Sequence, residues 1–203
     1  DYEYEYDWDE DYEEESFTGS TLQILNNSTV LAKVGSGEDT ADVYIEAGDI
    51  TVNNSDITAE VEDVGEAYIE MIAGDYYYLW DEGYEEESFT GSTVDILNNS
   101  TVLASIGSSL TTAEVDIYSG AITVDASSVT AQVVNGNGNA YVDMFAVDGD
   151  ITITDSDILA NVVGLGHAEV VLGALGLINI GGVTGSSITA SSGGSLLTAE
   201  VFM

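Results

Sequence analysis

The chain has 203 residues, of which 38 are acidic and only one is Lys or Arg, so its formal net charge is −37. The absence of Cys excludes a disulfide scaffold, a thiolate metal site and a cysteine nucleophile. Nucleic acid and anionic membrane surfaces are also negative, so we expect neither as a partner. Hydrophobic residues make up 44% of the chain, too many for a disordered polyacid, and no apolar run approaches the roughly 20 residues of a membrane span.

Residues 1–20 form an acidic–aromatic segment in which carboxylates alternate with aromatic rings. In an extended strand this alternation would place the rings on one face and the carboxylates on the other. A second copy of the segment occupies residues 75–91. The aromatic side chains of the two copies are candidate partner contacts: Tyr2, Tyr4, Tyr6, Trp8, Tyr76, Tyr77, Tyr78 and Trp80.

The carboxylates of the same two segments suggest a cation site, because Ca²⁺ takes about six to eight oxygen ligands. The candidate ligands are Asp7, Asp9, Glu10, Asp11, Glu13, Glu14, Glu15, Asp81, Glu82, Glu85, Glu86 and Glu87. No D-x-D-x-D-G loop accompanies them. Two alternatives therefore stay open: a solvated acidic loop whose rings pack on the protein wall or on a partner, and an aromatic platform for glycans.

An internal repeat follows the first segment. Residues 16–32 (SFTGSTLQILNNSTVLA) recur almost unchanged at residues 88–104 (SFTGSTVDILNNSTVLA). A finer pattern, Ser-x-[Val/Ile]-x-Ala, begins at Ser28, Ser55, Ser100, Ser127 and Ser156, with a degenerate copy at Ser186. A short alternating apolar piece precedes each copy, and a third piece opens with Ala at Ala41, Ala67, Ala113, Ala140, Ala168 and Ala199.

Each cycle of about 27 residues thus holds three short alternating pieces, which period-two alternation and β-branched content identify as strands. Equivalent positions recur in register, so we predict an all-β fold, a right-handed parallel β-helix (β-solenoid) spanning residues 1–203 as a single unit. Hexapeptide spacing, typical of the left-handed form, is missing. We expect two inward columns, one of Val30, Ile57, Val102, Val129, Ile158 and Ile188 and one of Ala32, Ala59, Ala104, Ala131, Ala160 and Ala190.

One cycle is too long: the Ala starts at Ala67 and Ala113 lie 46 residues apart, because the second acidic–aromatic segment is inserted between two strands. The chain starts inside a copy of that insertion. Two interpretations follow: either the 203 residues are a segment of a longer solenoid, or the end of one molecule completes a coil with the start of the next. Both predict open coil edges, which are templates for association. Residues 168–203 are expected to form less acidic, Gly-rich C-terminal coils.

Two smaller patterns carry further candidates. N-x-[ST] sequons make Asn26, Asn27, Asn53, Asn98 and Asn99 candidate glycosylation sites; the alternative is Asn in left-handed turns or in stacked amide ladders. Leu recurs on every second coil of one outer face, which makes Leu31, Leu103 and Leu159 candidate lateral contacts. The alternative is that the duplication simply copied this stripe.

The recurring phrase G-D-I-T-[VI]-x-x-S-x-I-x-A-x-V, followed by a piece that opens with Ala, occurs at 48–61 with 67–71 and at 149–162 with 168–172. It resembles the repeats of filamentous-haemagglutinin-like adhesins, large repetitive proteins of bacterial surfaces. The resemblance covers roughly residues 16–203 and implies a β-helix shaft, export, and an adhesive or structural role. The acidic–aromatic insertions depart from that family pattern.

We therefore expect an extracellular or cell-surface structural protein, a subunit or segment of a filament, sheath or adhesin that self-associates end to end into a homopolymer. The alternative is a surface module that binds a cation such as Ca²⁺, or a glycan, through the acidic–aromatic segments. We do not expect an enzyme: with one basic residue, the chain lacks the side chains that cleavage of acidic polysaccharides needs. Paired carboxylates of a glycoside hydrolase stay as an alternative.

Overall fold

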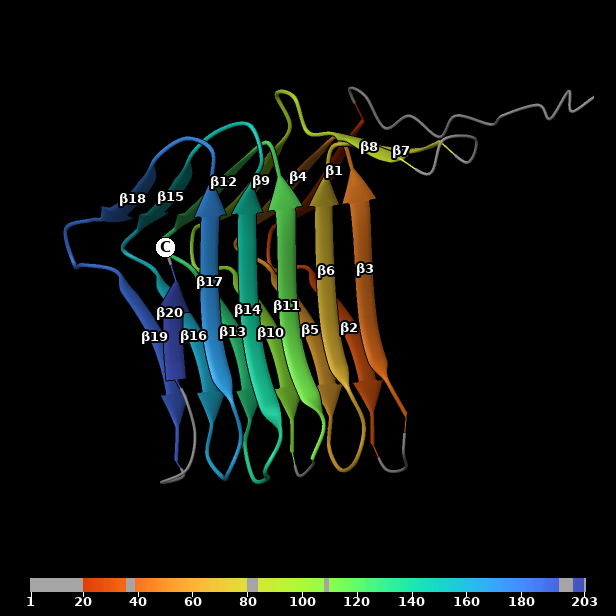
Figure 1. Ribbon diagram of the computed structural model, residues 1–203, viewed down its shortest axis with the longest axis vertical. Helices are drawn as coiled ribbons and strands as arrows, with labels where there is room; N and C mark the ends of the chain where they lie inside the picture. Colours follow the sequence, from red (N-terminus) through yellow and green to blue (C-terminus); the bar gives the residue numbers. More distant parts are fainter. Residues whose placement is uncertain (1–19, 36–38, 80–83, 108–109, 194–198, 203) are drawn as a thin grey trace, which may run out of the picture.

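The computed structural model describes residues 20–35, 39–79, 84–107, 110–193 and 199–202. These residues form an all-β structure, a parallel β-solenoid of about five turns with about 28 residues per turn. Each of the three parallel sheets has six strands, so that about five turns separate its first strand from its last (Figure 1). The predicted parallel β-helix with three short strands per coil is therefore confirmed.

The three sheets are named here in the order in which the chain first enters them. The first contains β1 (Thr21–Leu25), β4 (Asp49–Asn53), β9 (Thr93–Leu97), β12 (Ala121–Asp125), β15 (Ile151–Thr154) and β18 (Ile178–Gly181). The second contains β2 (Thr29–Val34), β5 (Asp56–Val61), β10 (Thr101–Ile106), β13 (Ser128–Val133), β16 (Asp157–Val162) and β19 (Ser187–Ser192). The third contains β3 (Ala41–Ala47), β6 (Ala67–Ala73), β11 (Thr112–Ser119), β14 (Asn139–Ala146), β17 (Ala168–Ala174) and β20 (Ala199–Phe202).

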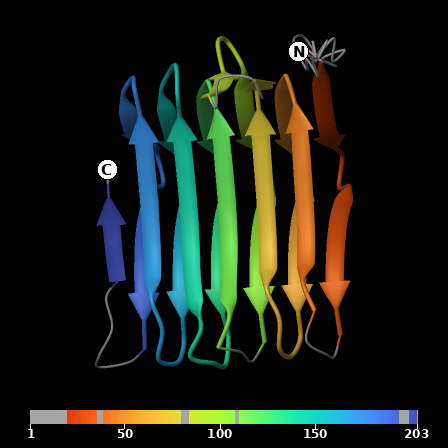
Figure 2. The ribbon, with the colours of Figure 1, turned by 45° about the vertical axis from the view of Figure 1, so that its right-hand side comes forward.

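The course of the chain is right-handed. In Figure 1 the strands of the third sheet run upward in front, those of the second sheet run downward behind, and successive coils advance from right to left. Figure 2, turned by 45°, shows the same stack from the side of the earliest coils. Every strand pair among these coils is parallel, so equivalent residues of successive repeats lie side by side.

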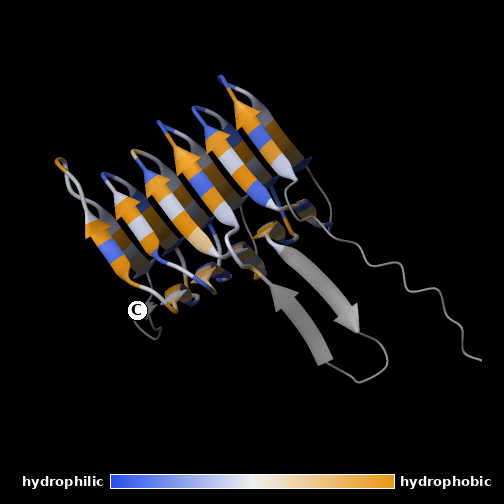
Figure 3. Ribbon diagram, turned by 90° about the horizontal axis from the view of Figure 1, so that it is seen from above, coloured by the Kyte–Doolittle hydropathy of each residue, from blue (hydrophilic) through white to orange (hydrophobic). Residues whose placement is uncertain are grey.

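Alternation along each strand separates an apolar interior from a polar exterior, visible as bands of orange and blue in Figure 3. The register confirms the two predicted inward columns. It pairs Val30 with Ile57 and Ala32 with Ala59, and the same pairing continues coil by coil as far as Ile188 and Ala190. Ile57 and Ala59 are fully buried. Burial of these columns is the main stabilising term of the fold.

The recurring Ser forms a hydrogen-bonded ladder at one corner of the solenoid. The backbone N–H of Ser100 donates to Ser127 Oγ (3.2 Å), and the N–H of Ser127 donates to Ser156 Oγ (3.1 Å). The hydroxyl of Ser127 in turn donates to the carbonyl of Asp125 (2.8 Å). Each hydroxyl thus satisfies backbone groups that the corner leaves without a strand partner.

Ser127→Ala should lower the free energy of unfolding by about 1–2 kcal/mol, because it leaves the buried N–H of Ser100 without an acceptor. Urea denaturation followed by circular dichroism measures this loss. Ser128→Ala is the matched control, because it removes a hydroxyl one residue away that is no rung of the ladder. Equal effects of the two substitutions would contradict a stabilising role of the ladder.

The corner between the first and second sheets requires left-handed backbone, which Asn tolerates better than other residues with a side chain. Asn27, Asn54 and Asn99 have φ between 49° and 62°. The side-chain amide of Asn54 donates to Asn27 Oδ1 (3.0 Å), and that of Asn98 donates to Asn53 Oδ1 (3.0 Å). The structure thus gives these corner Asn a structural role.

The second acidic–aromatic insertion departs from the solenoid between β6 and β9. It contains an antiparallel pair, β7 (Asp75–Leu79) and β8 (Tyr84–Ser88). In its register Tyr76, Tyr77 and Tyr78 lie opposite Glu87, Glu86 and Glu85. The inserted residues therefore form a hairpin and add no rung to the solenoid.

Candidate functional site

Acidic and aromatic side chains gather on the outer face of the third sheet, away from the two insertions. One outward column runs through Asp42, Tyr68, Glu114, Tyr141 and Glu169. The adjacent column, two residues further along each strand, runs through Tyr44, Glu70, Asp116, Asp143 and Val171. Parallel strands place neighbours in a column about 4.8 Å apart. Three acids, Glu70, Asp116 and Asp143, are therefore consecutive in one column.

The centre of this face is a carboxylate cluster formed by Glu114, Asp116 and Asp143. One carboxylate oxygen from each lies within 4.8 Å of the other two. Asp116 is only 7% exposed although it points outward. Its Oδ2 accepts a hydrogen bond from the Tyr68 hydroxyl (2.8 Å). Among the described residues, no hydrogen-bond donor reaches Asp116 Oδ1 or Asp143 Oδ1, and both atoms are buried.

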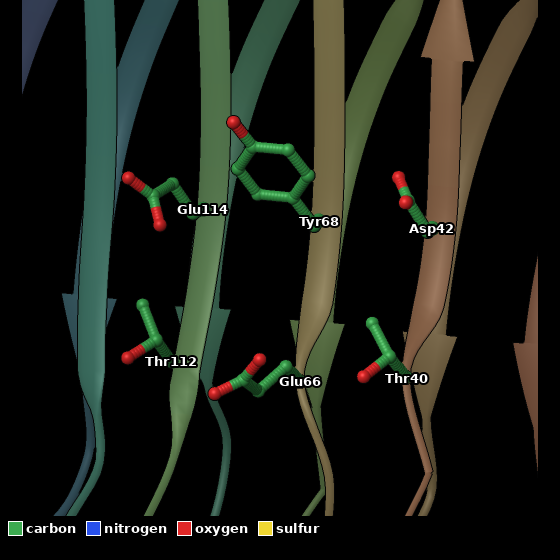
Figure 4. Close-up of a pocket in the computed structure, with 6 residues that line it drawn as sticks. All are labelled: Thr40, Asp42, Glu66, Tyr68, Thr112 and Glu114. Carbon is green, nitrogen blue, oxygen red and sulfur yellow. The ribbon is translucent and has the colours of Figure 1, made fainter.

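Aromatic rings border the carboxylate cluster along the strands. Tyr118 and Phe145, two residues beyond Asp116 and Asp143, stack in parallel with ring centroids 5.5 Å apart. On the other side the Tyr68 ring leans toward β11 (Figure 4). Rings on both sides withdraw the carboxylates from water and lower the local dielectric constant, which strengthens every electrostatic interaction there.

The electrostatics of the carboxylate cluster follow from burial and like charge. Burial raises the pKa of Asp116, and the hydrogen bond from Tyr68 opposes that effect. Burial and then the negative charge of Asp116 raise the pKa of Glu114 to about 7. The same two causes raise the pKa of Asp143 to about 6. Like charges opposite one another in a sheet are destabilising. Neutralising the negative charge of this cluster would therefore stabilise the fold.

The chain's one basic side chain does not supply that neutralisation. Lys33 contacts Glu60 (3.2 Å) and Glu62 (2.7 Å), and Glu60 belongs to β5 of the second sheet. The one His, His167, lies 2.8 Å from the carboxylate of Glu169. Neutralisation of the carboxylate cluster therefore has to come from protons or from a bound cation.

A hollow of about 380 Å³ opens beside the carboxylate cluster. Six side chains from the first three strands of the third sheet and from the residues just before them line it (Figure 4): Thr40, Asp42, Glu66, Tyr68, Thr112 and Glu114. Its lining is polar and consists of three carboxylates, two threonine hydroxyls and one tyrosine. Because Glu114 belongs to both features, the hollow connects the carboxylate cluster with solvent.

The ends of the described solenoid form a second candidate surface. On the edge strands β2 and β19 the inward side chains, among them Val30, Ala32, Ile188 and Ala190, are only partly buried. A hollow of about 350 Å³ opens onto the interior at the β1–β3 end. At the other end Ile178 of β18 packs against the core and is only partly buried. Both ends therefore present apolar core to solvent.

These ends also differ in charge from the coils between them. Residues 20–35, which contain β1 and β2, include no acid, and residues 173–193, which contain β18 and β19, include no charged side chain. By contrast, each of the four interior coils carries acids in these two sheets or at the corner between them, for example Asp49, Asp95 and Asp125. In the edge strands, acids are confined to the third sheet.

Most of the predicted cation ligands and partner contacts lie outside the described residues, namely Tyr2, Tyr4, Tyr6, Asp7, Trp8, Asp9, Glu10, Asp11, Glu13, Glu14, Glu15, Trp80, Asp81 and Glu82. Glu85, Glu86, Glu87 and Tyr76, Tyr77, Tyr78 lie on the hairpin strands β8 and β7. Their proposed roles stay predictions. Leu31, Leu103 and Leu159 share one column, alternating with Thr, and Leu31 is 55% exposed; a lateral contact through this stripe is likewise a prediction.

The carboxylate cluster was not among the residues predicted from the sequence. The sequence does contain a pattern that points to two of its three members. When the strands that open with Ala are aligned, Asp116 and Asp143 fall at the same position of successive coils, together with Glu70. Burial of Asp116 by rings on the flanking positions has no comparable signature in the linear pattern.

Comparison of the chain with family models, with curated proteins and with solved structures finds no significant match. Within the described residues, no helix has the length and apolarity needed to cross a membrane.

Proposed function

We propose that this protein is a structural β-solenoid, a shaft unit that extends by stacking the open coil of one copy on the open coil of another. The observation that carries the proposal is the composition of the edge strands. Natural proteins protect exposed sheet edges with charges, whereas here the edges of two sheets lack the acids found throughout the rest of the chain. Their one charged side chain, Lys33 on β2, is paired with Glu60 and Glu62.

Stacking would continue the interior columns across the junction. A second copy placed against the β18–β19 edge would add its Val30 and Ala32 to the rows that end in Ile188 and Ala190. The partly exposed apolar side chains at both edges would then be buried, at about 25 cal/mol per Å² of apolar area. Unpaired backbone groups of the edge strands would gain partners as well.

The resemblance of the repeats to filamentous-haemagglutinin-like adhesins supports a location outside the cell or on its surface, as part of a filament, sheath or adhesin. Polyanionic partners such as nucleic acid and anionic membranes are disfavoured by the net charge of −37.

Sedimentation velocity on the 203-residue chain tests axial stacking. We expect rod-like oligomers whose size grows with protein concentration and with salt, since salt screens repulsion between like-charged copies. Ala190→Asp, which places a charge in the inward row at the open edge, should give a monomer. Thr189→Asp is the matched control, because it adds the same charge one residue away on the outer face, and it should still associate.

Circular dichroism of both variants establishes that each retains the β-solenoid. A wild-type protein that stays monomeric at every concentration, or two variants that associate equally, would refute the proposal.

A further inference from the structure

We propose that Glu114, Asp116 and Asp143 of the carboxylate cluster bind a hard divalent cation of the size of Ca²⁺. The site lies on β11 and β14 of the third sheet and is separate from the acidic–aromatic segments. It does not depend on axial stacking, because both strands belong to interior coils.

The three carboxylates are close enough together to share one ion. One oxygen from each of the three carboxylates lies within 4.8 Å of the other two. Ca²⁺–oxygen bonds are about 2.3–2.6 Å long, so two ligands of one ion are at most about 5 Å apart. Three oxygens this close together lie at most about 2.8 Å from a common centre, so a small adjustment of the side chains brings all three within bonding distance of a single ion.

Within the described part of the chain, two of the carboxylate oxygens are buried without a hydrogen-bond partner. Asp116 is more than nine-tenths buried, yet its Oδ1 has no hydrogen-bond partner among the described residues, and neither has Asp143 Oδ1. A buried carboxylate oxygen without a partner is costly. Tyr68 donates to Oδ2 of Asp116, which leaves Oδ1 as the oxygen without a described partner.

The chemistry of the donor atoms indicates which ions the site prefers. The ligands are carboxylate oxygens alone, which suit Ca²⁺ and similar hard ions and disfavour metals that prefer imidazole or thiolate. Glu70, next to Asp116 in the same column, brings further negative charge to the site. Asp116 is only 7% exposed, so the site is sheltered from water, which strengthens the attraction between ion and carboxylates.

Entry to the site is provided by the hollow that Glu114 and Tyr68 help to line. A dehydrated Ca²⁺ ion is smaller than a water molecule, so it can reach oxygens that water does not. The ion would place two positive charges among the stacked acids of this column. Because its ligands come from both strands, it would also link β11 to β14.

Isothermal titration calorimetry with CaCl₂ on the full chain, first stripped with a chelator, tests the site. We expect one saturable site above the weak binding of scattered surface acids. Asp116→Asn, which keeps the shape of the side chain, should weaken that site at least tenfold (roughly, for the loss of one of three charged ligands). Asp143→Asn should do the same and serves as a second variant if the first fails to fold.

Asp56→Asn is the matched control, because it removes one exposed carboxylate from β5 of the second sheet, outside the site and its hollow, and should leave the affinity within about twofold. MgCl₂ titrated in parallel should bind more weakly, since Mg²⁺ demands shorter and more regular coordination. The proposal is overturned if the wild-type chain shows no saturable site, if Asp116→Asn and Asp56→Asn titrate alike, or if Mg²⁺ binds more tightly than Ca²⁺.

Discussion

Ala131→Asp should abolish the cooperative unfolding transition of the protein or lower its free energy of unfolding by more than about 4 kcal/mol. Ala131 is fully buried in the inward Ala column, between Ala104 and Ala160 of the neighbouring coils. No basic side chain can pair with an acid introduced there, because the only Lys lies on β2. Chemical denaturation followed by circular dichroism provides the measurement.

Thr130→Asp is the control for this substitution. Thr130 is one residue earlier on β13 and points to the outer face, where it is partly exposed. The same charge at this position should change the free energy of unfolding by less than about 1 kcal/mol. If the two variants were equally stable, the assignment of inward and outward positions on the second sheet would be wrong.

Stability should fall as pH rises from about 5 to about 8, in the presence of a chelator. Carboxyl groups whose pKa is raised in the folded state bind more protons there than in the unfolded chain, so the folded state is favoured at the acidic side of this range. The pKa of Glu114 is raised to about 7 and that of Asp143 to about 6, in each case by burial first and then by neighbouring acids.

The size of this effect follows from the two pKa values. One pKa unit corresponds to about 1.4 kcal/mol. Because Glu114 and Asp143 are partly exposed and interact with the same neighbours, we expect a total loss of about 3 kcal/mol over the range. Thermal melts at a series of pH values, at constant ionic strength, measure it.

A charge-removing variant separates this local effect from the general repulsion in a chain of net charge −37. Glu114→Gln should flatten the decline of stability between about pH 5 and pH 7. Asp63→Asn, which removes an exposed acid before β6 that is not among the charges acting on Glu114 or Asp143, should leave the slope nearly unchanged. A stability that is constant or rises with pH in the wild-type protein would contradict the placement of the carboxylate cluster.

The solenoid could be predicted from the sequence because stacking converts a linear repeat into spatial columns. Ser100, Ser127 and Ser156 recur at the same point of each cycle, and the structure joins them in one hydrogen-bonded ladder. The same holds for the inward Val, Ile and Ala rows. A parallel register leaves little freedom in the pairing, since slipping it by one residue would expose every apolar side chain of a strand.

The functional face was not predicted, because it depends on lateral neighbours and on burial. Asp116 alone, in the sequence AEVDI, has the pattern of an ordinary outward acid. Its burial requires Tyr68 from the preceding coil and the rings beside it. The low acidity of the C-terminal coils is evident in the sequence of residues 168–203, whereas the placement of both acid-free segments, 20–35 and 173–193, on edge strands depends on the strand order of the sheets.

Electron cryo-microscopy of the assembled protein tests axial stacking most directly. We expect unbranched filaments one solenoid wide, with strands perpendicular to the filament axis and a coil spacing of about 4.8 Å that continues across the junction between copies. Isolated single-copy particles, or arrays in which solenoids associate only side by side, would contradict axial stacking of the acid-free edges.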